Sequence, residues 1–473
     1  MRKLLLYNSF SNSLETFVPL DNKNVRMYVC GPTVYASPHI GNARPLVIFD
    51  VLFRILREIY GENVTYVRNI TDVDDKINAT AQERNISIQA LTGEVIGEFH
   101  ANLKKLNLLP VTVEPKATLH IAEMLSIIKK LIENGFAYEA QGHVLFRVKK
   151  MSQYGMLSKI NVEDMIAGSR VEIAPYKEDP LDFVLWKPAA EGTPSWESDF
   201  GRGRPGWHIE CSAMSHKYLG EQFDIHAGGQ DLMFPHHENE LAQNFGAFGC
   251  TMAQYWLHNS MLVVNGQKMS KSLSNIIALD EILQKYDGEI IRYVLLNSHY
   301  QKILNWTDQA LHQAKHGLNR LYGALRIGTC NCHNQSAATQ CTSDAITTAA
   351  GNSIIDAICN NLNTPLALHN LHILADKIFQ LNEQGYNQDR IKNLCVVIKR
   401  SAALLGLLDK NATEWFRMGF QKISENEINR LIDERTIAKL AHDFERADEI
   451  RVQLLKNDIA IEDGEEGTSW KTI

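Results

Sequence analysis

The residues from Gly201 to Glu240 include several side chains that could bind a metal ion. These candidate ligands are Cys211, His226, His236, His237, Glu238 and Glu240. Glycines and a tryptophan surround them, with few long apolar runs, which is more typical of a site than of a hydrophobic core. Thiolate, imidazole and carboxylate groups are the ligands that zinc takes in proteins.

The segment after Pro235, HHENELAQNFGAF, predicts the first turns of a helix, because proline suits a helix start and the apolar residues keep helical spacing. His236 and Glu240, four residues apart, could hold one ion, but His237 and Glu240, three apart, could do so too. The spacing leaves the histidine undecided. Such a pair is more often an exposed surface pair, and Cys211 could be an ordinary buried cysteine.

Two strands near the N-terminus would place further polar residues at the edge of a sheet. VRMYVC (25–30) and NVTYVRNIT (63–71) predict buried strands, and LVIFDVLFRILREIYG (46–61) predicts a helix between them. This order favours a doubly wound parallel sheet, which binds ligands at the carboxyl ends of its strands.

Two polar segments follow these strands. His39-Ile40-Gly41-Asn42 would lie at the start of the helix, where glycine lets a phosphate approach the backbone and His39 can donate to it. The acidic run from Thr71 to Lys76 could cap a helix or face a ligand. Either segment alone is weak evidence, because both patterns are common by chance.

A later segment, YWLHNSMLVVNGQKMSKSLSNII (255–277), predicts β-structure and a turn at Asn265-Gly266. The next residues, Lys268 to Ser272, place two lysines and two hydroxyl groups on an exposed loop. Such a loop is usually a basic surface turn. The alternative is a mobile phosphate clamp, in which Lys268 and Lys271 neutralise charge on a leaving pyrophosphate.

Length and composition indicate a globular protein of several domains, with 473 residues of which 45% are hydrophobic. No apolar run is long enough to span a bilayer, and Tyr7-Asn8-Ser9 ends the apolar start before a signal peptide could form. We therefore expect a cytoplasmic protein without a membrane partner, whose eight cysteines favour burial or metal binding over disulfides. The net charge of −7 argues against a chain that coats nucleic acid, but not against a local basic groove.

Helices are predicted to dominate from about Ile276 onward. They are interrupted by a polar linker, GTCNCHNQSAATQCTS (328–343). Its Cys330, Cys332 and Cys341 lack a matching second ligand pair, which argues against a zinc site there.

HIGN after the first strand and KMSKS on the later loop resemble the two signatures of class I aminoacyl-tRNA synthetases. Further segments narrow the resemblance to the cysteinyl-tRNA synthetase family over nearly the whole chain. These segments are MYVCGPTVY, PHIGNAR, TDVDDKI, GRPGWHIECSAM, GGQDLMFPHHENE, NGQKMSKSLSN and IEDGEEGTSW.

The resemblance implies a role for each matching residue. It assigns a zinc ion to Cys30, Cys211, His236 and Glu240, which selects His236 over His237. It assigns ATP, carried with Mg²⁺, to His39, Gly41, Asn42, Gly229, Asp231, Lys268 and Lys271, of which His39, Lys268 and Lys271 are catalytic. It assigns the cysteine pocket to Thr71 and Trp207, and a position behind the ligands to His226.

One residue departs from the family pattern. Class I motifs end in histidine, whereas this chain has Asn42. Asparagine can donate a hydrogen bond to a phosphate but cannot carry a positive charge. We therefore expect a similar role for Asn42 with less electrostatic stabilisation.

The resemblance also implies a domain organisation with a Rossmann-type α/β catalytic domain, an insertion and C-terminal α-helical tRNA-binding domains. The expected parts are the two halves of the catalytic domain (1–110 and 201–265), a connective insertion that contacts the acceptor end (111–200), the KMSKS loop with linking helices (266–312), a helical bundle (313–410) and an anticodon-binding region (411–473). A monomer is expected, because that state is common in the family.

The implied activity is a cysteine–tRNA ligase acting on ATP, L-cysteine and tRNA(Cys). A hydrophobic pocket rejects a near-isostere by only about 10²-fold, too little to separate cysteine from serine. Zinc binds a thiolate far better than a hydroxyl group. We therefore expect the substrate thiolate to occupy an open position on the zinc, so that no editing domain is needed.

Three other hypotheses fit the sequence less well. A ligase that hands cysteine to a small amine would need no anticodon-binding region, yet FERADEIRVQLLKNDIAIED (444–463) resembles the tRNA-binding segment. A zinc-dependent hydrolase using His236 and Glu240 would leave HIGN and KMSKS unexplained. A non-catalytic tRNA-binding relative would not need the intact signature lysines.

Overall fold

The computed structural model describes residues 2–160, 174–270, 273–329, 345–385, 388–417, 423–457, 459–464 and 467–472. The chain forms two compact units. The first comprises Met1–Ala314, Gly351–Asn370 and Leu404–Leu407, and the second comprises Lys315–Ala350, Leu371–Ala403 and Leu408–Ile473.

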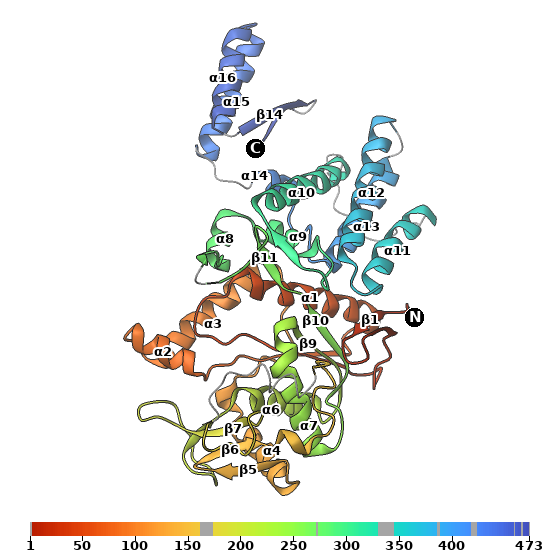
Figure 1. The fold of residues 1–473 in the computed structure, drawn as a ribbon. Coiled ribbons are helices and arrows are strands. Elements are labelled where there is room, and N and C mark those ends of the chain that lie inside the picture. Colours follow the sequence, from red (N-terminus) through yellow and green to blue (C-terminus); the bar gives the residue numbers. More distant parts are fainter. Residues whose placement is uncertain are drawn as a thin grey trace. The chain divides into compact units, whose positions relative to one another are not determined.

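A four-stranded parallel sheet forms the centre of the first unit (Figure 1). In spatial order its strands are β10 (Ala253–Asn259), β9 (Phe223–Gly229), β3 (Val25–Val29) and β4 (Val64–Arg68). Helix α1 (Ile40–Tyr60) contacts all four strands, and α6 (Trp207–Leu219) contacts β3 and β4. The strands are largely buried, as strands covered by helices must be. The predicted doubly wound α/β fold is confirmed.

Helix α1 begins earlier than the sequence pattern predicted. The pattern placed its start near Leu46, whereas the helix starts at Ile40 and contains Pro45. A capping box explains the difference: the His39 side chain accepts a hydrogen bond from the Asn42 N–H, and the Asn42 side chain accepts one from the His39 N–H. HIGN is therefore the cap and first turn of the helix.

The region between β4 and β9 adds helices and an antiparallel sheet to the same unit. Its helices include α2 (Asp75–Glu83), α3 (Ile88–Lys105) and α4 (Ile121–Glu133), and its sheet has the order β5 (Ala137–Ala140), β6 (His143–Phe146), β7 (Phe183–Pro188) and β8 (Gly203–Pro205). One continuous hydrophobic core joins this sheet to the central one, with Tyr28 and Val67 packed in the same cluster as Phe146, Trp186 and Leu241.

A small three-stranded sheet carries the lysine-containing loop. Strand β11 (Leu262–Val264) pairs antiparallel with β12 (Gln267–Lys268) and parallel with β13 (Leu304–Trp306). The helices α8 (Leu279–Lys285) and α9 (Gly288–Leu296) connect β12 to β13. Lys271, predicted to bind ATP, lies outside the described residues.

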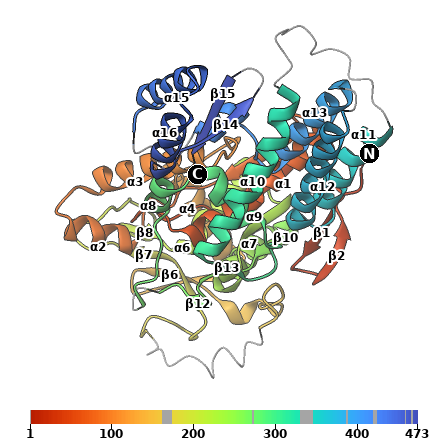
Figure 2. The ribbon, with the colours of Figure 1, turned by 90° about the horizontal axis from the view of Figure 1, so that it is seen from above.

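The remaining helices are α10 (Asp308–Thr329), α11 (Ala345–Cys359), α12 (Thr364–Glu383), α13 (Gln388–Leu404), α14 (Ala412–Arg417), α15 (Glu425–Leu440) and α16 (Phe444–Lys456). The chain then forms a hairpin of β14 (Ile459–Gly464) and β15 (Gly467–Thr472), which lies beside α15 and α16 in Figure 2. The predicted C-terminal helices are therefore followed by a β-hairpin. Ile428, Leu454 and Trp470 belong to the core that joins these elements.

Cys330, Cys332 and Cys341 lie outside the described residues. Within the described part of the chain, no helix is both long and apolar enough to cross a membrane.

Candidate active site

The four predicted zinc ligands come together at the carboxyl end of the central sheet. Cys30 follows β3, Cys211 lies on α6, His236 lies in a turn at 233–237, and Glu240 lies on α7 (Glu238–Phe248). Their candidate ligand atoms all lie within 4.8 Å of one another. Cys30 Sγ is 3.8 Å from Cys211 Sγ and 3.6 Å from Glu240 Oε1, which is 3.1 Å from His236 Nε2.

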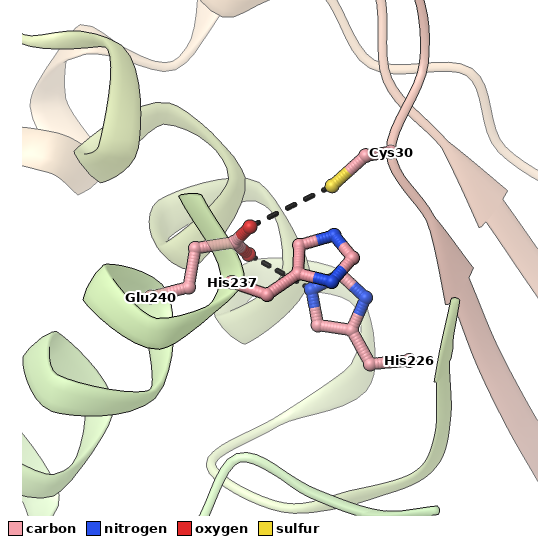
Figure 3. Close-up of side chains that lie close together, drawn as sticks. All are labelled: Cys30, His226, His237 and Glu240. Atoms are coloured by element: carbon pink, nitrogen blue, oxygen red, sulfur yellow. Dashed lines mark hydrogen bonds and ion pairs between the residues drawn. The ribbon is translucent and has the colours of Figure 1, made fainter. Parts of the chain in front are cut away.

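A second set of possible ligands shares two of these residues. Cys30, His226, His237 and Glu240 also place their candidate ligand atoms within 4.8 Å of one another, and Figure 3 shows them converging. Glu240 Oε1 faces Cys30, while Glu240 Oε2 lies 2.9 Å from His226 Nε2. His226, predicted to stand behind the ligands, therefore contacts one of them directly.

The electrostatics of the cluster favour a bound cation. Burial, followed by Cys211 and Glu240, raises the pKa of Cys30 well above its ordinary value. A hydrogen bond with Cys30 favours the Cys211 thiolate, but burial and the Glu240 charge raise the pKa of Cys211 on balance. Burial also lowers the pKa of His236 to about 3, which keeps the imidazole neutral. Two thiols, a neutral imidazole and a carboxylate fit a divalent metal, whose charge would allow the thiols to ionise.

Aromatic and imidazole rings surround the cluster. The Trp207 ring stacks on the His236 ring with the centroids 4.2 Å apart, and Trp207 remains 40% exposed. His208 Nδ1 lies 3.0 Å from His236 Nδ1, so the opposite ring nitrogen of His236 faces Glu240. Among the described residues, His226 Nδ1 and His237 Nε2 are buried side-chain nitrogens without a hydrogen-bond partner.

A chain of buried hydrogen bonds links Thr71 to both cysteine-bearing segments. The Thr71 hydroxyl group donates to Glu210 Oε2 (3.0 Å) and accepts from Asn69 Nδ2 (3.2 Å). Asn69 Oδ1 in turn accepts from the Gly31 N–H at 2.8 Å. Because Gly31 follows Cys30 and Glu210 precedes Cys211, Thr71 lies between the two segments that carry the thiols.

The HIGN turn and the KMSKS segment lie against each other. The Ile40 N–H donates to the Ile277 carbonyl (3.1 Å), and the Leu279 N–H donates to the Pro38 carbonyl (2.8 Å). A Cβ atom at Gly41 would lie 2.7 Å from Met269 Cε and 3.0 Å from the His39 ring, so both side chains lie directly against this glycine. Lys268 is exposed at the end of β12.

Gly229 and Asp231 lie at the end of β9, close to His39. Burial lowers the pKa of His39, while the nearby Asp231 charge opposes that shift. A Cβ atom at Gly229 would lie 2.3 Å from Asp231 Oδ1, so a larger residue here would force the Asp231 carboxylate to move. His39, Gly41, Asn42, Gly229 and Asp231, five of the six described members of the predicted ATP set, therefore lie near one another, and Met269, which follows Lys268, lies against Gly41.

The sequence interpretation missed three residues of the cluster. His208 supports His236, and it could have been found because it lies three residues before Cys211 on one helix. His258, 2.8 Å from His237 Nδ1, lies on β10, where no local pattern marked it. Glu210, the partner of Thr71, was passed over as a neighbour of Cys211.

Comparison with known proteins gives consistent matches. Residues 16–316 match the sequence model of the family described as "tRNA synthetases class I (C) catalytic domain". The chain is 48% identical over 469 residues to the cysteine–tRNA ligase of Gluconobacter oxydans, covering 99% of this chain and 98% of that protein. It is 47% identical over 472 residues to the cysteine–tRNA ligase of Rhodospirillum rubrum, covering 99% of both.

Solved structures show the same fold at low sequence identity. The methionyl-tRNA synthetase of Mycobacterium tuberculosis in complex with methionyl-adenylate aligns with a TM-score of 0.62 at 15% identity, over 83% of this chain and 93% of that one. A putative arginyl-tRNA synthetase from Campylobacter jejuni aligns with a TM-score of 0.52 at 13% identity, over 82% of this chain and 95% of that one.

Proposed function

The chain belongs to the cysteine–tRNA ligases, a family of class I aminoacyl-tRNA synthetases, and we propose that it works in two steps. It joins L-cysteine to AMP with release of pyrophosphate from ATP, and it then transfers cysteine to the 3′-terminal ribose of tRNA(Cys). The observation that carries this proposal is the meeting, in one unit, of the HIGN turn, the KMSKS segment and a cluster of two cysteines, a histidine and a glutamate.

We assign zinc to Cys30, Cys211, His236 and Glu240 rather than to the overlapping set. The first set offers two thiolates, the soft ligands that zinc favours. His208 also contacts His236 Nδ1, which orients His236 Nε2 toward Glu240. A second residue that orients the ring in this way is typical of histidines that bind metals. When bound, zinc would take the substrate thiol as a thiolate, which a serine hydroxyl group cannot match.

Thr71 and Trp207 would form the rest of the cysteine pocket. The Thr71 hydroxyl group already donates to Glu210 and accepts from Asn69, so its remaining lone pair can accept a hydrogen bond from the substrate ammonium group. The exposed face of Trp207 would cover the substrate beside His236. This pocket orients the cysteine carboxylate for attack on the α-phosphorus of ATP.

Activation needs positioning and charge neutralisation more than a nucleophilic side chain. His39 and Lys268, together with Lys271, would face the phosphates of Mg²⁺–ATP, while Asp231 would accept hydrogen bonds from the ribose. Gly41 and Gly229 carry no side chain and so let the nucleotide approach the backbone. The Asn42 side-chain oxygen is occupied by the His39 N–H, which leaves its amide nitrogen as a donor.

The C-terminal elements would serve tRNA recognition. We propose that residues 411–473, built on α15, α16 and the β14–β15 hairpin, bind the anticodon, and that the helices before them support the tRNA.

The test is cysteine-dependent exchange of pyrophosphate into ATP, with serine measured beside cysteine, on zinc-loaded and chelator-treated protein. We expect exchange with cysteine only, lost on chelation and restored by zinc. Charging of tRNA(Cys) then separates a tRNA ligase from a ligase with a small amine acceptor. Folded, zinc-loaded protein that shows no exchange would contradict the proposal.

A further inference from the structure

Arg44 lies in the second turn of α1, fully buried, and holds two separate loops through their backbones. Its Nη1 donates to the carbonyl groups of Ser260 and Met261, both at 2.7 Å. Its Nη2 donates to the carbonyl groups of His299 (3.2 Å) and Lys302 (2.6 Å). One side chain therefore makes four hydrogen bonds to residues more than 200 positions away in the sequence.

Among the described residues, the hydrogen-bond partners of this buried cation are all carbonyl oxygens. Burial lowers the pKa of Arg44 to about 10, so the guanidinium group stays charged at neutral pH. Its Nε is one of the buried nitrogens without a hydrogen-bond partner in the described part of the chain. Burying a charge without a carboxylate is costly. Apolar packing does not explain an arginine at this buried position, whereas its hydrogen bonds to the backbones of two loops do.

The two loops are the supports of the lysine-containing hairpin. Residues 260–261 connect β10 to β11, and residues 299–302 lead into β13, the parallel partner of β11. Strand β11 turns directly into β12, which ends at Lys268. Arg44 therefore holds the residues just before β11, the first strand of the hairpin, and the residues that lead into β13, the strand beside it.

The far end of the same loop is also attached to α1. The Ile40 N–H donates to the Ile277 carbonyl, and the Leu279 N–H donates to the Pro38 carbonyl. Both ends of the segment from β11 to α8 are thus attached to α1 or to the residues just before it. The distance between His39 and Lys268 depends on these attachments.

We propose that Arg44 is a positioning residue for amino-acid activation, which sets the hairpin bearing Lys268 against the HIGN turn so that both meet the ATP phosphates. This rests on the proposed function, and it adds a residue that contacts no substrate. Arg44 acts through the hairpin, so its effect should depend on Lys268.

The test compares Arg44→Lys with Arg292→Lys in the full-length, zinc-loaded protein. Arg292 serves as the control, because it is also fully buried and donates to the carbonyl groups of Leu405, Leu106 and Asn107 but to neither loop. Unlike Arg44, it also donates to a carboxylate, that of Asp50. Because small misplacements of catalytic groups cost up to about 100-fold in rate, we expect R44K to lower kcat of exchange by about 10–100-fold. The KM for cysteine should stay within about twofold, and R292K should keep kcat per folded molecule within about twofold.

A double-mutant cycle with Lys268→Ala identifies the route of the effect. If Arg44 acts through the hairpin, R44K should cost less than about threefold in the K268A background. An equal loss in both backgrounds, a parallel rise in the KM for cysteine, or an equal loss in R292K would overturn the proposal.

A second variant serves if R44K does not fold. The exposed Asn305 on β13 accepts a hydrogen bond from the Gly266 N–H at 2.8 Å, which holds the tip of the hairpin. Asn305→Ala should lower kcat severalfold and lose that effect in the K268A background, whereas unchanged kcat would contradict the proposal. Wild-type protein without exchange would instead reject the proposed function itself.

Discussion

Glu240 offers one carboxylate oxygen to each of two possible ligand sets. Oε1 lies 3.1 Å from His236 Nε2, and Oε2 lies 2.9 Å from His226 Nε2. The set with His236 also contains Cys211, whereas the set with His226 contains His237. The two assignments therefore differ in which histidine the metal requires.

We expect His236→Ala to lose zinc and His237→Ala to keep it. Removal of a supporting residue near a metal costs about 10–100-fold in affinity, and removal of a ligand costs more. H236A should therefore purify with less than one zinc per chain and show no cysteine-dependent exchange. H237A should retain about one zinc per chain, with a loss of zinc affinity of at most about 10–100-fold. Metal analysis of both variants checks this, and the reverse pattern would place the metal on the second set.

At the scale of elements, the apolar pattern of the sequence did not predict the first residue of α1. The apolar spacing placed the helix start near Leu46, where the helical pattern begins. The structure starts the helix at Ile40 through mutual hydrogen bonds between His39 and Asn42. Histidine is not among the usual capping residues, so this cap had no sequence signal.

One carboxylate ties α15 to the final hairpin. Asp463 on β14 accepts hydrogen bonds from Arg435 at 2.7 and 3.0 Å, from Lys439 at 2.7 Å and from Thr468 at 2.8 Å. The Arg435 bond, followed by those from Lys439 and Thr468, lowers the pKa of Asp463. A carboxyl group whose pKa is lower in the folded state stabilises the fold above its unfolded pKa of about 3.9. That contribution is lost as the pH falls below that value toward the folded pKa.

We therefore expect Asp463→Asn to loosen the hairpin at pH 7 and to flatten its response to acid. Amide hydrogens in β14 and β15 should exchange faster in D463N than in the wild type at pH 7, with the difference shrinking below about pH 4. The effect should be modest, because the Asp463 side chain is 47% exposed and solvent screens the pair. Asp433→Asn, at an exposed position of α15, is the control. Equal exchange in wild type and D463N would contradict the prediction.

At the scale of the whole molecule, sequence reasoning recovered the parallel sheet and the facing motifs but not the complete cluster. Local periodicity identified β3, β4 and the helix between them, because apolar residues are spaced differently along a buried strand and along an amphipathic helix. Cys30 and Cys211 stand 181 residues apart, so no local spacing could join them, and only resemblance to a family did. His258 had neither signal, because its contact with His237 is fixed by long-range packing.

The four proposed metal ligands all belong to the first unit, so we expect removal of a metal from them to perturb that unit alone. The four proposed ligands come from the end of β3, from α6, and from the turn and helix at 233–248, all within Met1–Ala314. A metal that binds only the folded state stabilises it, so chelation should raise hydrogen exchange in the segments that carry the ligands. Amides of α15 and α16, in the second unit, should keep their exchange rates. Exchange measured with and without chelator on the full chain checks both halves of the prediction. Equal loosening of α6 and α16 would mean that the metal supports the whole chain, and no loosening of α6 would mean that the cluster folds without it.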